Sequence, residues 1–210
     1  MYFPVCRIFA YCQHDFERNL LFMRVISGTA RGTRLVSLGS TEIRPTLDRV
    51  KESFFNQIGP GLDGVTFLDL FAGSGNMGIE ALSRGAVTVA FVEPNLKAQR
   101  IIVQNLEKCR MTDPGSRWVL LKSTASAGLE ALKKRGLSFD LIYIDPPFAD
   151  GLYDPTLQEL AISDVLQSEA VVVVEHFHKT VLQQKYDKLK FYKNRRLGDS
   201  CLTFYSFENS

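Results

Sequence analysis

Apolar positions divide the central part of the chain into alternating strands and helices. Five short, almost continuous apolar runs predict strands that are buried on both faces: residues 65–71, 87–92, 117–121, 139–144 and 170–174. Segments with helical spacing follow the first three of these strands, at residues 78–83, 96–109 and 127–134. Such alternation is typical of a parallel sheet covered by helices on both faces. We therefore predict a doubly wound α/β fold.

Both ends of the chain depart from this alternation. Residues 24–38 predict two short strands around a turn at residues 28–32, a polar hairpin that we expect to pack on the main domain or on a partner. Residues 47–58 predict a helix with Thr46 as its N-cap. Residues 190–193 and 201–207 predict two antiparallel strands around a turn at residues 195–199. The sheet should therefore be mostly parallel, with an antiparallel C-terminal part.

Length and composition fit one main domain with a small appendage. The chain has 210 residues, of which 45% are hydrophobic, which is enough for one core. We divide it into an extension at residues 1–22, with Met23 as a candidate native start, a hairpin at residues 23–42 and a main domain at residues 43–210. The four cysteines lack the spacing of a zinc site, and no apolar run reaches the length of a membrane span. We expect a cytoplasmic monomer with reduced cysteines.

Charge is unevenly distributed along the chain. Residues 1–59 carry 8 basic and 5 acidic side chains, residues 60–175 carry 10 and 15, and residues 176–210 carry 7 and 3. The two basic ends favour a polyanionic partner, although a solvated basic face explains the same counts.

The stretch that ends the fourth predicted strand carries the first candidate chemistry. Asp145, Pro146, Pro147 and Phe148 follow directly after this strand. Neither proline has an N–H for a sheet ladder, so the strand has to end there. Open α/β sheets bind ligands at this carboxyl edge. Asp145 and Phe148 are therefore candidate site residues, and a proline-rich turn with an incidental acid is the alternative.

A second candidate site follows the first predicted strand. Residues 73–78 form a GxGxxG pattern between a strand and a helix, which fits the pyrophosphate of a dinucleotide or the aminocarboxypropyl end of S-adenosylmethionine (SAM). Glu93, at the end of the second strand, can accept hydrogen bonds from the ribose of either cofactor. Asp69 can accept from the ammonium group of SAM but would repel a phosphate, which favours SAM. Small polar residues at 122–126 give a weaker signal for an adenine contact.

These features together resemble a known family. Residues 69–75, Glu93 and the Asp-Pro-Pro-Phe sequence at 145–148 look like a class I SAM-dependent methyltransferase of the kind that methylates exocyclic amines of bases. Further stretches are similar to the bacterial small-subunit ribosomal RNA methyltransferase D family, over roughly residues 23–207: residues 24–28, 31–32, 44–52, 55–56 and 80–86. The resemblance implies a Rossmann-like sheet and methyl transfer from SAM to N2 of one guanine in 16S ribosomal RNA.

The resemblance and the chemistry of the residues assign roles to individual positions. The catalytic group is Asp145, Pro146, Pro147 and Phe148: the Asp145 carboxylate and the Pro146 carbonyl accept from the guanine amine, and Phe148 stacks on the base. The residues expected to bind the cofactor are Asp69, Phe71, Ala72, Gly73, Ser74, Gly75, Glu93, Pro94, Thr124 and Ala125. The residues expected to contact RNA are Arg24, Arg31, Arg34, Arg44, Thr46 and Arg49. The expected partner is 16S ribosomal RNA or the small ribosomal subunit.

Other functions remain open at this point. An amino-methyltransferase acting on adenine or guanine of another RNA or of DNA would use the same chemistry, although the chain has no room for a large target-recognition domain. A dehydrogenase would share the glycine loop but would leave residues 145–148 unexplained. A catalytically silent RNA-binding assembly factor is the third alternative. His176 and His178 alternate on one predicted strand face without a third ligand, so we predict no metal site.

Overall fold

The structure is a computed structural model that describes residues 23–38, 45–112, 117–147 and 151–208. Residues 45–47 are described by their backbone alone. The extension at residues 1–22, Arg44 and Phe148 therefore lie outside the described residues, as does the side chain of Thr46.

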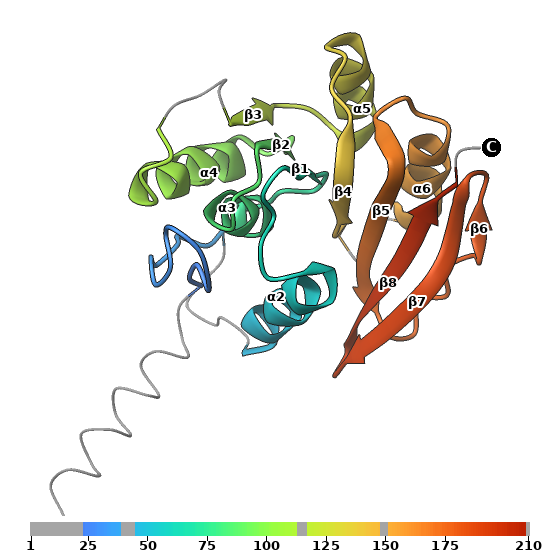
Figure 1. Ribbon diagram of the computed structural model, residues 1–210, viewed down its shortest axis with the longest axis horizontal. Coiled ribbons are helices and arrows are strands. Elements are labelled where there is room, and N and C mark those ends of the chain that lie inside the picture. The colour runs from blue at the N-terminus through green and yellow to red at the C-terminus, as the bar shows by residue number, and fades with distance from the viewer. Residues whose placement is uncertain (1–22, 39–44, 113–116, 148–150, 209–210) are drawn as a thin grey trace, which may run out of the picture.

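A single mixed sheet forms the middle layer of the fold (Figure 1). Its strands run in the order β3-β2-β1-β4-β5-β8-β7-β6. Their bounds are β1 (Thr66–Asp69), β2 (Thr88–Val92), β3 (Trp118–Leu121), β4 (Phe139–Ile144), β5 (Leu166–Phe177), β6 (Lys185–Tyr186), β7 (Leu189–Leu197) and β8 (Ser200–Phe207). Pairing is parallel from β3 through β5 and antiparallel from β5 through β6. The carboxyl ends of β1, β2, β4 and β5 therefore meet at one edge.

Helices cover both faces of this sheet. Their bounds are α2 (Pro45–Ile58), α3 (Asn76–Ser83), α4 (Leu96–Lys108), α5 (Ala125–Lys134) and α6 (Tyr153–Ala161). Neighbouring strand residues point to opposite faces, so Phe67 packs in one core with α2, α3 and α4, and Leu68 packs in the other with α5 and α6 (Figure 1). Among the described residues, no helix is long and apolar enough to cross a membrane.

The predicted doubly wound fold is confirmed, and β4 has the predicted bounds. Helix α2 begins at Pro45, so Thr46 lies in its first turn and the predicted N-cap is wrong. The turn between β7 and β8 is shorter than predicted, because Leu197 still pairs with Ser200. The hydrophobic pattern did not predict α6, β6 or the first four residues of β5.

The predicted N-terminal hairpin is reduced to one antiparallel bridge, between Arg24 and Arg34. Three backbone hydrogen bonds cross the segment, from Val25 to Thr33, from Gly32 to Val25 and from Leu35 to Met23. The pairing does not extend into regular strands, because the amides of Ile26, Ser27 and Val36 donate instead to side chains of α3 and α4. Met23, Val25 and Leu35 are buried in the core that contains α2, α3 and α4. The segment thus packs on the main domain, which is one of the two predicted outcomes.

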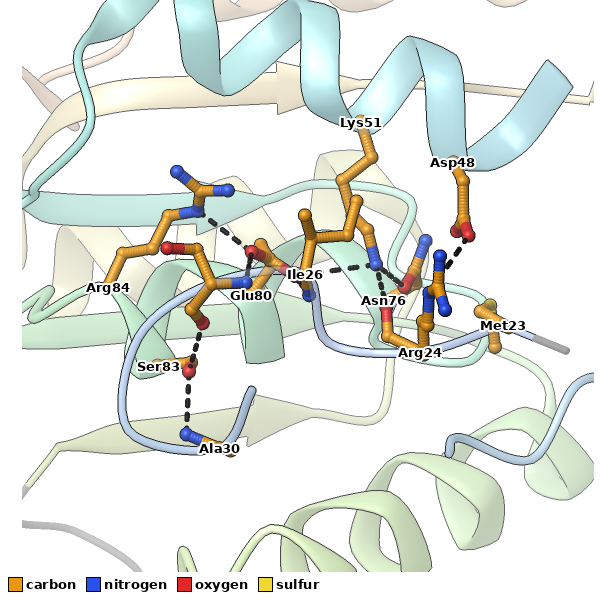
Figure 2. Close-up of polar contacts among 12 residues, drawn as sticks. Met23, Arg24, Ile26, Ala30, Asp48, Lys51, Asn76, Glu80, Ser83 and Arg84 are labelled. Carbon is orange, nitrogen blue, oxygen red and sulfur yellow. Dashed lines mark hydrogen bonds and ion pairs between the residues drawn. The ribbon is translucent and has the colours of Figure 1, made fainter. Parts of the chain in front are cut away.

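A buried ion pair fastens this segment to two helices (Figure 2). The Lys51 side chain extends from α2, donates to Asn76 Oδ1 over 2.8 Å and lies 3.4 Å from Glu80 Oε2 on α3. Lys51 also donates to the Arg24 carbonyl. Glu80 in turn accepts from the backbone N–H groups of Ile26 (2.7 Å) and of Ser27 (2.9 Å).

Arg84 completes the surroundings of the Glu80 carboxylate. Its Nε donates to Glu80 Oε1 over 2.8 Å, and its guanidinium lies 4.4 Å from the centre of the Phe55 ring on α2. Two cations and two backbone amides therefore offset the cost of burying this acid. One carboxylate links α2, α3 and residues 24–27.

We expect Glu80→Ala to lower the free energy of unfolding by about 3–5 kcal/mol, because it leaves Lys51 buried without its partner. Hydrogen exchange at the Ile26 and Ser27 amides should accelerate by more than global destabilisation explains. The control is Glu130→Ala, which removes the exposed Lys134 ion pair and should leave stability unchanged. Equal effects of the two substitutions would contradict the role given to Glu80.

Candidate active site

A cavity of about 160 Å³ opens at the carboxyl edge of the sheet. The loop between β1 and α3 forms one wall, from Phe71 to Ser74, and Lys51 of α2 lies on another. Three acids line it, one after or within each of three neighbouring strands: Asp69 of β1, Asp145 after β4 and Glu175 of β5. The structure thus brings the glycine loop and the Asp-Pro-Pro segment, 70 residues apart in sequence, to one place.

Glycine is required at two positions of the GxGxxG pattern, one before α3 and one within it. Gly75 precedes α3 with a φ of 78°, a left-handed conformation that side chains disfavour. A Cβ at Gly78 would lie 2.2 Å from Phe91 Cε1, so only glycine lets α3 approach β2 this closely. These are the turn and packing roles that the GxGxxG pattern predicts. The Asn105 side chain of α4 holds the loop from outside by donating to the Ser74 carbonyl over 3.0 Å.

Glu93 supports the same loop from the end of β2. Its Oε2 accepts from the Gly73 N–H and its Oε1 accepts from the Asn95 N–H, each over 2.8 Å. The side chain is buried and does not line the cavity beside Asp69. Each carboxylate oxygen can accept a second hydrogen bond, so the predicted contact of Glu93 with a ribose stays a prediction.

Asp69 is the most deeply buried of the three acids in the cavity, with 2% of its surface exposed. Its Oδ2 accepts from the Gly78 N–H over 3.0 Å. Burial raises the pKa of Asp69 from 3.8 to about 7, against the lowering effect of that hydrogen bond, and the charge of Glu93 adds to the rise. Its carboxylate would be stabilised by a cation beside it.

Asp145 and Glu175 lie next to each other on neighbouring strands. Burial raises the pKa of Asp145 well above its usual value, and the charges of Glu175 and Asp69 raise it further. Burial also raises the pKa of Glu175, while hydrogen bonds from Tyr143 and Ser200 act in the opposite direction. The cavity therefore gathers three acids whose ionised forms its own side chains leave largely uncompensated.

The structure separates the predicted site residues into two sets. Asp69, Asp145 and the loop from Phe71 to Ser74 share the cavity, with Pro146 buried and Pro147 exposed just after Asp145. The other predicted cofactor residues do not line it: Gly75, Glu93, Pro94, Thr124 and Ala125.

Pro94 is exposed, and Thr124 is the N-cap of α5, where its Oγ1 accepts from the Ala127 N–H over 3.4 Å. This capping bond gives Thr124 a structural role beside the predicted adenine contact, which stays a prediction.

Among the predicted RNA contacts, Arg31, Arg34 and Arg49 are exposed. Arg24 is half-buried, with its Nε 3.7 Å from Asp48 Oδ2. Their role also stays a prediction.

Sequence reasoning did not assign Lys51, Tyr143 and Glu175 to this site, although all three line the cavity. Glu175 carried a usable signal, since an acid that follows a β-branched run is the same signal that identified Glu93. Lys51 and Tyr143 carried none, because a lysine in a helix and a tyrosine in a strand have no distinctive spacing. His176, considered for a metal, instead bonds through Nε2 to Thr203 Oγ1 at 2.7 Å.

Comparison with known proteins gives a consistent picture. Residues 23–206 match the family described as conserved hypothetical protein 95. A Bacillus subtilis (strain 168) protein, provisionally named an rRNA methyltransferase, is 36% identical over 87% of this chain and 98% of its own length. The ribosomal RNA small subunit methyltransferase D of Escherichia coli (strain K12) is 33% identical over 73% of this chain and 74% of its own length.

Solved structures agree with this assignment. A structure from Escherichia coli, provisionally named a methyltransferase, aligns with a TM-score of 0.75 and 26% identity, over 90% of this chain and 99% of that one. A conserved hypothetical protein of Streptococcus pyogenes aligns with a TM-score of 0.68 and 36% identity, over 75% of this chain and 95% of that one. The chain thus shares its fold with solved structures that include one provisionally named as a methyltransferase. The chain belongs to the conserved hypothetical protein 95 family, together with relatives named ribosomal RNA small subunit methyltransferase D.

Proposed function

We propose that this protein transfers a methyl group from SAM to the exocyclic N2 amine of a guanine in 16S ribosomal RNA. One observation carries the proposal: Asp145, a hydrogen-bond acceptor for an amine, lines the same cavity as the glycine loop and Asp69. Relatives named as small-subunit rRNA methyltransferases support the class of substrate. That the protein acts as a cytoplasmic monomer stays a prediction.

The residues around the cavity fit the amino-acid end of SAM. Asp69 is buried beside the loop and has one carboxylate oxygen that takes no hydrogen bond from the Gly78 N–H, so it can accept from an ammonium group. The backbone of residues 71–74 lines the cavity and leaves space for a ligand to approach closely. When bound, SAM supplies an electrophilic methyl group.

Asp145 acts on the amine that receives the methyl group. The lone pair of guanine N2 is delocalised into the ring, so the amine is a poor nucleophile. A carboxylate that accepts from its N–H localises the lone pair and stabilises the positive charge that develops on nitrogen. Pro146 and Pro147 fix the chain direction after Asp145, which positions the Pro146 carbonyl as the second acceptor. Asp145 also complements the paired donors N1–H and N2–H of guanine, which favours guanine over adenine.

The base has to be unpaired to reach this acceptor, because Watson–Crick pairing occupies the same edge. Exposed arginines at residues 31, 34 and 49 supply positive charge for RNA phosphates. Arg24 follows Met23 in the chain, and Met23 lines the cavity. The N-terminal segment therefore connects the proposed RNA contacts to the proposed reaction site.

We expect Asp145→Ala to reduce methyl transfer by about 100- to 1,000-fold while SAM binding and the folded state are retained, because an acceptor used in the transition state is lost. The measurement is a single-turnover assay with labelled SAM and unmodified small-subunit RNA, alongside calorimetric SAM binding. Asp164→Ala, an exposed acid at the opposite edge of the sheet, is the matched control. A rate near that of the wild type for Asp145→Ala would show that the segment is only a turn.

We expect Asp69→Asn to weaken SAM binding by about 10- to 100-fold and to stabilise the ligand-free protein at neutral pH. The folded-state pKa of Asp69, about 7, is above its unfolded value, so its ionisation lowers stability as the pH rises from about 4 to about 7. The asparagine variant should lose this pH dependence, a gain of up to about 4 kcal/mol at neutral pH. Urea unfolding at several pH values measures it, and parallel wild-type and variant curves would contradict it.

We expect Arg31→Glu combined with Arg34→Glu to abolish binding to small-subunit RNA and to leave SAM affinity unchanged. Removing two cations and adding two anions opposes the phosphate contacts that dominate RNA affinity. Arg135→Glu with Lys185→Glu, both exposed on other elements, makes the same change in net charge and should weaken RNA binding much less. If both double variants lose affinity equally, the N-terminal segment is not a specific RNA contact.

A further inference from the structure

Two acids occupy equivalent positions on neighbouring parallel strands. The last paired residues of β4 and β5 are Ile144 and Val174, so Asp145 and Glu175 are each the next residue along. Paired parallel strands lie about 4.8 Å apart and present in-register side chains on the same face. Both acids line the cavity, and the charge of Glu175 contributes to the electrostatic surroundings of Asp145. Asp145 and Glu175 therefore form a carboxyl pair.

Hydrogen bonds stabilise the ionised form of Glu175 more than that of Asp145. The Tyr143 hydroxyl donates to Glu175 Oε2, and Ser200 at the start of β8 contributes a second hydrogen bond. These donors stabilise Glu175 as a carboxylate. Asp145 gains no such lowering contribution, and burial, Glu175 and Asp69 all act to keep it protonated. With one proton on the pair, the proton is better held by Asp145.

The other charged groups facing the pair do not neutralise it. Asp69 of β1 is a third acid on the same cavity. Lys51 of α2 is the cation among the described residues that line the cavity, and its ammonium is bound to Glu80, Asn76 and the Arg24 carbonyl. Tyr153 of α6 lies near both acids, and its own pKa is raised to about 12 by burial and by their charges.

We infer that Asp145 and Glu175 share one proton in the ligand-free protein and release it to solvent when the sulfonium of SAM enters the cavity. This inference rests on the proposed function and concerns the same site. Glu175 is then a positioning residue: it sets the proton affinity of Asp145, whose two oxygens can both accept from guanine N1–H and N2–H only when the group is ionised. The O–H bond of Asp145 breaks, and the proton passes to the buffer.

The pair distinguishes the cofactor from its product by charge. SAM carries a sulfonium, whereas S-adenosylhomocysteine carries a neutral thioether with nearly the same shape. A positive charge beside the pair favours its doubly ionised form, and a neutral sulfur does not. SAM affinity should therefore increase with pH by up to about tenfold per unit, below the apparent pKa of the pair. The affinity for S-adenosylhomocysteine should not show this increase with pH.

Calorimetric titration of the full chain tests this inference without any turnover. SAM and S-adenosylhomocysteine are each titrated at one neutral pH in phosphate and in Tris, whose different ionisation enthalpies reveal protons released on binding. We expect SAM to release close to one proton more than the product, because any proton that Asp69 loses on meeting the ammonium group is common to both ligands. Glu175→Gln keeps an oxygen for the Tyr143 hydroxyl to donate to but removes the charge, and should reduce the release. Glu107→Gln, exposed on α4, should release as many protons as the wild type.

The outcomes separate this inference from the proposed function. Equal proton release with SAM and with the product, or an undiminished difference between them in Glu175→Gln, would overturn the inference and leave the methyltransferase proposal standing. Failure of the wild-type chain to bind either ligand would overturn both. Binding of S-adenosylhomocysteine by Glu175→Gln with wild-type affinity shows that the variant is folded. The wild-type comparison of the two ligands tests the inference even if that variant is unstable.

Discussion

The buried Glu80 carboxylate is the interaction on which the arrangement of this protein depends. It accepts from Lys51, Arg84 and two backbone amides of the N-terminal segment. Desolvating such an ion pair is costly, so its value lies less in net stability than in fixing which groups meet. Asn76, which accepts from the same lysine, is the first residue of α3 and follows the glycine loop directly. The interaction that holds residues 24–27 therefore also sets one wall of the cavity.

The acids of the cavity differ from Glu80 in what surrounds them. Glu80 lies between two cations, whereas Asp69, Asp145 and Glu175 lie together without a comparable cation among the described residues. Their mutual repulsion and burial reduce the stability of the ligand-free fold. A cationic ligand that binds only the folded state would restore this loss. Binding sites that lower the stability of the fold until their ligand binds are common, because function often requires groups that stability alone would not favour.

The sequence correctly predicted those elements whose own residues form a clear pattern of apolar and turn-forming positions. Strand β4 is apolar on both faces and is followed by two prolines, so its bounds could be read directly. Strand β5 begins with Leu166, continues with three polar residues and has a positive φ at Glu169, so its first four residues show no apolar pattern. Helix α6 is short and contains Pro155 in its first turn. The N-terminal segment was misjudged because its partners, Glu80 and Asn105, are more than 50 residues away.

Individual residues of the candidate site could be predicted from the sequence, but which of these residues lie next to each other could not. Local sequence shows that an acid ends a strand, as for Asp69 and Asp145, and parallel topology then places such acids at one edge. Local sequence does not show register, and register decides which acids become neighbours. A shift of β5 by one residue would turn Glu175 to the other face, leaving Asp145 without a partner. The relation between these two acids is therefore a property of the strand pairing, and the proton that they are proposed to share depends on it.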